Sequence, residues 1–356
     1  MKKIPLLFLS LLLVCSGLIQ AEDSVSLSAD NPAIRYVGLF TEDFKSSWTG
    51  SQIDVRFQGP SASVRLEVQA GKQVAFAVVV DGVAQLLIAD AETKIYPVAE
   101  GLDPEVMHEL ILFRRSEAYF GVVKFEGFEF PAGTTVEKSA DPSRRMLVIG
   151  DSITCGYGNM ADDVSEGNTL KNENAWMAYA PLTARHFDAD LVMLCWSGRG
   201  LYRNRSIQGD TEGTLPKLFD AILPGQASPL WDHSAYVPDV VVINLGTNDS
   251  TDRNGEKPTL SKEDYVNCYQ DFIRRIRVTA PESTVFLTLG PMNNAPITLD
   301  WLEAAAAPFE NVHPFLYKPL NGAEDIGGHY HPSLIKHEKM SEELIREINA
   351  QGLWQE

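Results

Sequence analysis

The stretch VIGDSITCGYG, residues 148–158, joins an apolar segment to a glycine-punctuated turn. The segment Met146–Ile149 has the length and apolar character of a buried strand, and Gly150-Asp151-Ser152 follows it directly. In open α/β sheets, ligands bind beyond the carboxyl ends of the strands. The stretch therefore predicts a parallel sheet with Ser152 at its rim, where a serine is either a helix cap or a nucleophile.

Strand-like and helical segments alternate throughout the chain after Arg145. Within the second helical segment, Ser261 and Asp264 are placed to cap the first turn, and an amphipathic stretch follows His331. Alternating β and α segments predict a three-layer α/β/α domain with a parallel central sheet. The expected strands are Met146–Ile149, Asp190–Cys195, Val240–Asn244 and Thr284–Leu289, and the expected helices are Ala175–Phe187 and Lys262–Thr279.

The N-terminal part carries a different pattern, with short runs rich in Val, Phe and Ile separated by turn pairs. Within VVVDGVAQLLI, the pair Asp81-Gly82 suits the two-residue type I′ turn of a hairpin. Strands at this spacing, without helical stretches, predict an all-β sandwich of the jelly-roll type. We expect this sandwich over 22–133, a linker over 134–144 and the α/β domain over 145–356, with strands including Gln52–Gln58, Ser63–Gln69 and Val74–Val80.

The first residues have the pattern of an export signal. Lys2 and Lys3 precede the apolar run Ile4–Val14, and small and polar residues lead to Ala21. Because a membrane-spanning helix needs about 20 apolar residues, this run predicts a cleaved signal peptide over 1–21 and no membrane span. The bulky residue before Cys15 disfavours lipid attachment there, so we expect an exported protein, extracellular or periplasmic.

The formal net charge of the 356-residue chain is −18 at pH 7. This acidity disfavours nucleic acid or anionic membranes as partners, fits a neutral substrate and favours solubility. We expect a monomer. The three cysteines after the signal peptide are no disulfide framework, and buried free thiols are favoured over a Cys155–Cys195 bridge. The chain contains no CxxC, HExxH or Walker motif, so we expect neither a cofactor nor a metal.

Four polar clusters follow predicted strands or precede the last helix, and their strand ends converge on one edge of the sheet. An ester hydrolase needs a nucleophile, a general base and N–H donors for the oxyanion. The clusters are Ser152, SGRG at 197–200, NLGTND at 244–249 and GGHYHPS at 327–333. Taken alone, each has a simpler interpretation: in the same order, a helix cap, a tight turn, an Asx turn and a surface histidine.

Taken in order, GDSI, SGRG, GTND and HPS resemble the four blocks of the SGNH (GDSL-like) hydrolases, over roughly residues 145–350. The segments GDSITCGYGN and WSGRGLYRNR and the preceding sandwich resemble carbohydrate esterase family 2. This resemblance implies a secreted serine esterase that deacetylates plant-wall polysaccharide, such as acetylated xylan or glucomannan, through an acyl-serine. The alternatives are an esterase for another O-acyl ester, such as a sialate, and a non-catalytic carbohydrate-binding protein.

The resemblance also implies roles for individual residues. Ser152 would be the nucleophile and His331 its base, and the oxyanion hole would combine the N–H groups of Ser152 and Gly198 with the side chain of Asn248. Asp151 is expected to hold the turn. The aromatic side chains expected to contact a sugar are Tyr330 and Trp196.

The chain departs from the family pattern at the residue that orients the histidine. SGNH hydrolases carry an aspartate three residues before the catalytic histidine, where this chain has Gly328. Some family 2 members carry the aspartate two residues before it, where this chain has His329. A carboxylate there orients the imidazole. We therefore consider Asp325, His329 or a main-chain carbonyl as the group that holds Nδ1 of His331.

His329 is also a rival for the role of base. His331 is preferred because Pro332 keeps it extended and Ser333 can cap the following helix. The pair His329 and His331 also suggests a metal site, which the lack of nearby carboxylate or thiol ligands disfavours.

Overall fold

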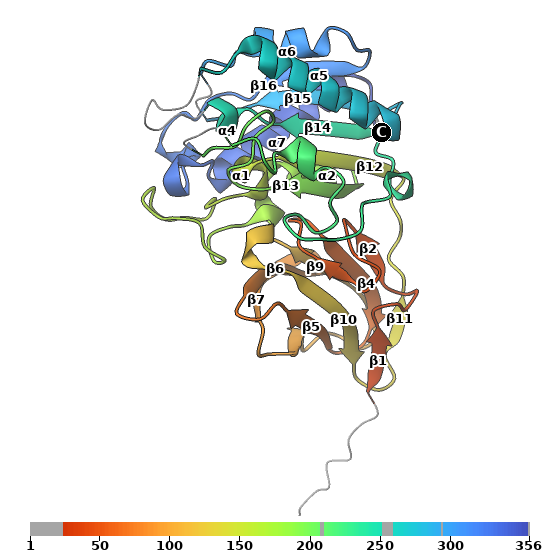
Figure 1. The fold of residues 1–356 in the computed structure, drawn as a ribbon. Coiled ribbons are helices and arrows are strands. Elements are labelled where there is room, and N and C mark those ends of the chain that lie inside the picture. The colour runs from red at the N-terminus through yellow and green to blue at the C-terminus, as the bar shows by residue number, and fades with distance from the viewer. Residues whose placement is uncertain (1–23, 207–209, 251–258, 293–294, 355–356) are drawn as a thin grey trace, which may run out of the picture.

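The protein, described from a computed structural model over residues 24–206, 210–250, 259–292 and 295–354, consists of two domains stacked end to end (Figure 1). The expected signal peptide, with Cys15, lies outside these residues. Within those ranges, no helix is both long and apolar enough to span a bilayer.

The C-terminal domain is built on a five-stranded parallel sheet in the order β13-β12-β14-β15-β16. The α/β fold with a parallel central sheet is therefore confirmed. The fifth strand was not predicted, because it is short and contains Pro314, which a strand tolerates only at an edge or bulge. The strands are β12 (Arg144–Gly150), β13 (Ala189–Cys195), β14 (Val240–Asn244), β15 (Thr284–Leu289) and β16 (Val312–Leu316).

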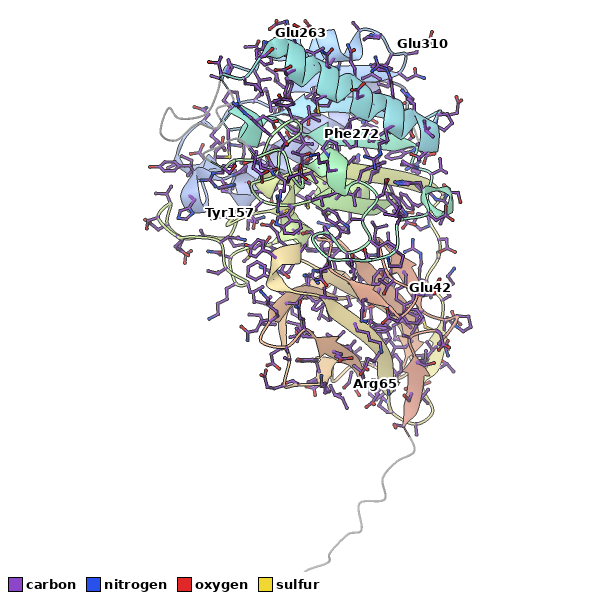
Figure 2. The ribbon with its side chains drawn as sticks, in the orientation of Figure 1. Glu42, Arg65, Tyr157, Glu263, Phe272 and Glu310 are labelled. Atoms are coloured by element: carbon purple, nitrogen blue, oxygen red, sulfur yellow. The ribbon has the colours of Figure 1, made fainter. Side chains whose placement is uncertain are left out.

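Helices cover both faces of this sheet (Figure 1), because the side chains of its central strands are buried on both sides. Leu147 and Ile149 of β12 pack in the core beneath α5 and α6, while Met146 and Val148 pack in the core shared with α2 and α7. Figure 2 shows Phe272 between α5 and the sheet, where its side chain is buried. The helices are α1 (Ser152–Cys155), α2 (Tyr179–His186), α3 (Leu215–Leu218), α4 (Thr247–Ser250), α5 (Lys262–Thr279), α6 (Leu299–Ala306) and α7 (Leu334–Ala350).

Two of these helices begin at the expected caps, and one is interrupted. The side chain of Ser261 accepts the Asp264 N–H at the start of α5, and Ser333 accepts the Lys336 N–H at the start of α7. The continuous helix expected over 175–187 is wrong, because Ala178 is extended and separates a 3₁₀ turn from α2. Pro181 lies in the first turn of α2, where its missing N–H costs no helical bond.

The N-terminal domain consists of two antiparallel sheets, as the strand pattern predicted. The expected hairpin joins β6 and β7, and both Asp81 and Gly82 have the positive φ of a type I′ turn. One sheet contains β1 (Val25–Ser28), β3 (Lys45–Ser46), β5 (Ala62–Val68), β8 (Ile95–Ala99) and β10 (Val123–Phe130). The other contains β2 (Arg35–Val37), β4 (Gln52–Gln58), β6 (Gln73–Val80), β7 (Val83–Asp90), β9 (Met107–Arg114) and β11 (Thr135–Glu137).

The segment 134–144, expected as a linker, is only partly one. Its residues Thr135–Glu137 form β11 and pair antiparallel with β4, so the sandwich extends beyond residue 133. The backbone of this stretch completes its hydrogen bonds on the edge of an existing sheet, which composition alone does not reveal.

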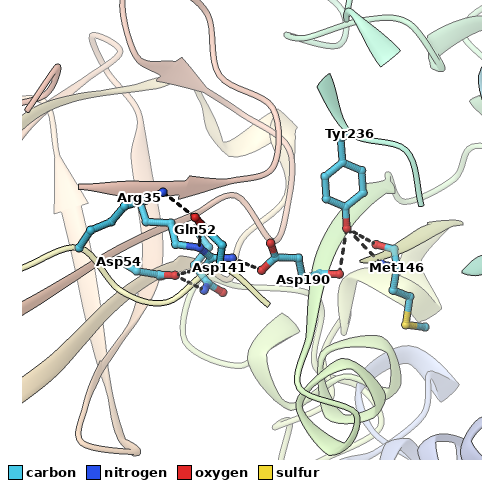
Figure 3. A network of polar contacts seen from close by, with 8 residues as sticks. Arg35, Gln52, Asp54, Asp141, Met146, Asp190 and Tyr236 are labelled. Atoms are coloured by element: carbon cyan, nitrogen blue, oxygen red, sulfur yellow. Dashed lines mark hydrogen bonds and ion pairs between the residues drawn. The ribbon is translucent and has the colours of Figure 1, made fainter. Parts of the chain in front are cut away.

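The two domains share an interface that is both apolar and ionic. Trp48 of the sandwich packs in the core of the C-terminal domain, and its indole N–H donates to the carbonyl of Ala221 at 2.7 Å. The buried Arg35 guanidinium contacts Asp54 of its own domain at 2.6 Å and Asp190 of β13 (Figure 3). The carboxylate of Asp141, in the connecting segment, lies 2.9 Å from the same guanidinium.

We predict that the interior of the C-terminal domain depends strongly on Phe272. Phe272→Ala should lower the free energy of unfolding by about 3–5 kcal/mol, since it deletes a buried ring and leaves a cavity. Val278→Ala, on the exposed side of the same helix, should change it by less than about 0.5 kcal/mol. Urea unfolding followed by tryptophan fluorescence checks both values, and equal losses would contradict this assignment of the core.

Candidate active site

Ser152 lies where β12 ends and α1 begins. The Asp151 carboxylate accepts the N–H of Ile153 and so caps α1, as expected from its place in the turn. The N–H of Ser152 itself has no acceptor among the described residues. The turn therefore presents the hydroxyl and the N–H of Ser152 together at the carboxyl end of the sheet.

The structure brings the Ser152 hydroxyl to the imidazole of His331. Oγ of Ser152 and Nε2 of His331 are 2.8 Å apart, and both side chains are 6% exposed. This distance is within hydrogen-bond reach, as a nucleophile and its general base require. The two residues can therefore exchange a proton directly.

A main-chain carbonyl holds the other nitrogen of this imidazole. Nδ1 of His331 lies 3.2 Å from the carbonyl oxygen of His329. The short contact requires a sharp backbone turn, in which His329 and Tyr330 have φ values of 50° and 61°. Two successive non-glycine residues in the left-handed region mark local strain, which is concentrated at functional sites.

Asp325 does not orient the histidine, so that candidate is wrong. Its carboxylate receives the ammonium of Lys339 at 2.6 Å and the N–H of Asn321 at 2.9 Å. Burial raises the pKa of Asp325, but these donors outweigh it and hold the pKa below the ordinary value. The Asp325 side chain therefore binds Lys339 of α7 and the main chain of Asn321, before the turn that carries His331.

The same loop explains why glycine occupies position 328. A Cβ on Gly328 would lie 2.7 Å from the carbonyl oxygen of Glu166 and 3.1 Å from Cβ of Ala161. The close approach follows from two hydrogen bonds, Gly328 N–H to Gly158 carbonyl and His329 N–H to Val164 carbonyl. An aspartate at position 328 would collide with the loop 158–166.

Tyr157 covers the imidazole of His331. The two rings stack with centroids 4.1 Å apart and planes 27° apart, and the Tyr157 hydroxyl lies 2.9 Å from Nδ1 of His329. Figure 2 places Tyr157 close to the boundary between the two domains. The His329 side chain thus contacts Tyr157, while only its carbonyl contacts His331. Sequence reasoning did not assign Tyr157 this position beside the histidine.

Gly198 supplies a second N–H near this end of the sheet. It is the third residue of a turn closed by a hydrogen bond from the Arg199 N–H to the Trp196 carbonyl. Its φ of 79°, with no positive φ at Ser197, is that of a type II turn, which favours glycine at this position. The Gly198 N–H has no acceptor in the part of the chain that the structure describes.

Asn248 reaches the same region from α4. Its amide nitrogen donates to Oδ2 of Asp151 at 3.1 Å and to the carbonyl of Arg199 at 2.8 Å. It thereby connects the turn that carries Ser152 to the loop that follows Gly198. For Asn248 to bind an oxyanion, one of these N–H groups has to be shared with it.

The neighbouring Asp249, to which we assigned no role, holds that loop. Its buried carboxylate accepts three main-chain N–H groups at 2.7–2.9 Å, which come from Leu201, Tyr202 and Arg203. The position of Asp249 in the block GTND was the feature of the sequence that could have indicated this role. Burial raises the pKa of Asp249, and burial also raises the pKa of Asp151 to about 7.

The two aromatic residues expected to contact substrate differ in exposure. Tyr330 is 63% exposed beside His331. Trp196 is partly buried against the core of the C-terminal domain, with the Arg199 guanidinium 4.9 Å from its ring centroid. Tyr330 is therefore the better placed of the two to meet a large ligand.

The structure also shows the state of the cysteines and the arrangement of possible metal ligands. Cys155 and Cys195 are buried free thiols, so the bridge between them, left open above, is not formed. No group of three or more His, Cys, Asp or Glu side chains among the described residues is arranged to hold a metal ion.

Comparison with known protein families assigns both domains. Residues 40–139 match the family described as Carbohydrate esterase 2 N-terminal, and residues 148–332 match the GDSL-like Lipase/Acylhydrolase family. A solved structure of a family two carbohydrate esterase from Clostridium thermocellum, in complex with cellohexaose, is 32% identical with a TM-score of 0.83. The match covers 90% of this chain and 100% of that chain.

Two further relatives extend the comparison. Cellulase/esterase CelE of Acetivibrio thermocellus is 35% identical over 94% of this chain, which spans only 41% of that protein. An acetylxylan esterase / glucomannan deacetylase of Cellvibrio japonicus is 28% identical over 86% of both chains.

We predict that position 328 tolerates no side chain. Gly328→Ala should lower the free energy of unfolding by about 1–3 kcal/mol, because the added methyl group overpacks the contact with loop 158–166. Gly167→Ala is the matched control, since a Cβ there meets His329 at an ordinary 3.4 Å. Urea unfolding measures both variants, and an unchanged stability of Gly328→Ala would refute the close approach.

Proposed function

Because the chain belongs to the GDSL-like acylhydrolases and, within them, to the family 2 carbohydrate esterases, we propose that it is a serine esterase that removes O-acetyl groups from polysaccharide. The observation that carries this proposal is the 2.8 Å contact between Oγ of Ser152 and Nε2 of His331. The substrate class rests on relatives named acetylxylan esterase / glucomannan deacetylase.

In the first step, Ser152 attacks the acetyl carbonyl. His331 takes the proton from Oγ as the Oγ–C bond forms, and the carbonyl oxygen becomes an oxyanion. The carbonyl of His329, at Nδ1 of His331, keeps the imidazole oriented and interacts favourably with the imidazolium. The C–O bond to the sugar then breaks, and the sugar oxygen leaves with the proton returned by His331.

In the second step, water releases the acetyl group from Ser152. His331 removes a proton from the attacking water, a second oxyanion forms, and Oγ departs with the proton from His331 as acetate is released. The proposed donors to both oxyanions are the N–H groups of Ser152 and Gly198 and the amide of Asn248. N–H groups already in place stabilise such an oxyanion without reorganisation.

A sugar-bearing substrate fits the surroundings of Ser152. The exposed ring of Tyr330 adjoins the base, and aromatic faces are suited to packing against sugar rings. The strong negative charge of the chain favours a neutral polymer over an anionic one. We therefore favour acetylated xylan or glucomannan over sialates and other small esters.

A second candidate function is glycan binding without turnover. The observation in its favour is the cellohexaose complex of the similar family two esterase, because cellohexaose carries no acetyl ester. The surface around Ser152 and His331 would then hold unmodified polysaccharide against Tyr330. The two functions differ in whether Ser152 is needed.

The remaining proposals concern the whole protein. We propose export after cleavage of residues 1–21, on the basis of their basic start and apolar run. We also propose that the sandwich shapes the substrate site and that the protein acts as a monomer.

We predict that acetate release depends wholly on Ser152. The wild type should release acetate from acetylated xylan and glucomannan faster than from O-acetyl sialoglycan, with the positions lost identified by NMR. Ser152→Ala should reduce release to background, since it removes the nucleophile, whereas Ser143→Ala, at an exposed position away from the site, should leave it unchanged. Retention of cellohexaose by a wild type that releases no acetate would instead favour the binding function.

We also predict a role for Asn248 in the transition state. Asn248→Ala should lower kcat by about 10²–10³-fold, as for loss of an oxyanion donor, with KM changed little. Asn267→Ala, exposed on α5, is the control. Steady-state kinetics with 4-nitrophenyl acetate checks this, and a change confined to KM would remove Asn248 from the oxyanion hole.

A further inference from the structure

A side chain of the β-sandwich domain holds the turn that carries Gly198. The carboxylate of Glu117 accepts the main-chain N–H of Ser197 at 2.6 Å and also accepts the Ser197 hydroxyl. Glu117 and Ser197 are 80 residues apart in sequence and belong to different domains. Ser197 directly precedes Gly198 in the Trp196–Arg199 turn.

Glu117 is placed by a rigid part of the sandwich. It precedes the 3₁₀ turn η1 (Ala118–Phe120), which connects β9 to β10. The fully buried Arg114 guanidinium donates to the carbonyls of Ser116, Glu117 and Gly121 at 2.6–3.1 Å. Arg114 therefore fixes the main chain of the β9–β10 connection, and the Glu117 carboxylate extends from this connection to Ser197 of the other domain.

A second contact holds the connection against the C-terminal domain. The Arg115 guanidinium donates to the carbonyl of Glu173 at 2.7 Å and to that of Lys171 at 3.1 Å. On the same connection, the Tyr119 hydroxyl accepts the side-chain amide of Asn168 at 2.8 Å. These bonds fix the position of the β9–β10 connection relative to the segment 168–173 of the C-terminal domain.

The carboxylate of Glu117 is fully buried, and Cys155 and Glu173 are among its neighbours. Burial raises its pKa, while the two Ser197 donors act in the opposite direction. Burial and the nearby Glu117 charge raise the pKa of Glu173 well above its ordinary value. Both oxygens of the Glu117 carboxylate accept from Ser197, whereas neither carboxyl oxygen of Glu173 has a hydrogen-bond partner among the described residues.

The contact with Glu117 acts on the part of the turn that decides where the Gly198 N–H points. In a type II turn, the peptide between the second and third residues is flipped relative to a type I turn. That peptide joins Ser197 to Gly198. Fixing both the N–H and the hydroxyl of Ser197 removes the freedom of this residue, so the following N–H is held in one direction before substrate binds.

We propose that Glu117 is a positioning residue for the oxyanion hole, so that the β-sandwich domain completes the active site of the other domain. This inference rests on the proposed esterase function. Glu117 acts through Ser197 and Gly198, and it does not touch the acyl group. The sandwich thus has a part in catalysis that is separate from any contact with polysaccharide.

The test compares substitutions of Glu117 in the full-length protein with 4-nitrophenyl acetate. Glu117→Ala should lower kcat by about 10–100-fold, less than or equal to the loss of one oxyanion donor, with KM within about threefold of the wild type. Glu117→Asp retains the charge but is too short for both Ser197 contacts, so it should lower kcat as well. Glu117→Gln should keep kcat within about fivefold, since its amide can accept the N–H of Ser197 and donate to the hydroxyl.

The matched control is another buried carboxylate at the domain interface. Asp54 contacts Arg35 and does not reach the Ser197 turn, so Asp54→Asn should reduce thermal stability but leave kcat of the folded enzyme unchanged. Should Glu117→Ala fail to fold, Glu117→Asp carries the same expectation.

The outcomes separate this inference from the proposed function. A wild type without esterase activity would remove the proposed function itself. An active wild type whose kcat stays within twofold in both Glu117→Ala and Glu117→Asp would overturn the role of Glu117 alone. An equal loss of kcat in Asp54→Asn would overturn it too, because the effect would then belong to the domain interface as a whole.

Discussion

The hydrogen bond between Ser152 and His331 is the interaction on which the rest of the site depends. Its partners are 179 residues apart in sequence, and the backbone around each of them determines where its side chain lies. The end of β12 and the cap supplied by Asp151 place Ser152. The strained turn before His331 and its hydrogen bonds to the loop 158–166 place the imidazole. The distance of 2.8 Å is thus a product of backbone geometry on both sides.

The site replaces a side-chain carboxylate with a main-chain carbonyl at Nδ1 of His331. A carbonyl carries only a partial charge, so its attraction to the imidazolium is weaker than that of a carboxylate, but its position is fixed by the backbone. The stacked ring of Tyr157 restricts the imidazole from another side. Orientation is therefore achieved by packing and backbone geometry where related sites use charge.

Buried charges connect the two domains, and each has partners that offset its loss of hydration. Arg35 binds carboxylates from both domains and from the segment between them. Glu117 accepts two donors from Ser197 across the boundary, while Arg114, within the sandwich, donates to the carbonyl oxygens around Glu117. Removing one member of such a set leaves the other buried without compensation. The domains are consequently expected to behave as one unit rather than as independent modules.

Sequence alone determined the elements whose stability is local or whose faces are wholly apolar. The strand before Gly150, the capped helix α5 and the Asp81-Gly82 hairpin follow from hydrophobic runs, capping side chains and turn chemistry, which act over a few residues. The order of the clusters also led to the expectation that Ser152 and His331 meet, and they do. Only the tertiary structure decided which contacts keep these residues in position. Asp325 is bound by Lys339, a side chain at Gly328 would collide with loop 158–166, and Glu117 reaches Ser197 across the domain boundary. These depend on distances between segments remote in sequence, which no local pattern encodes.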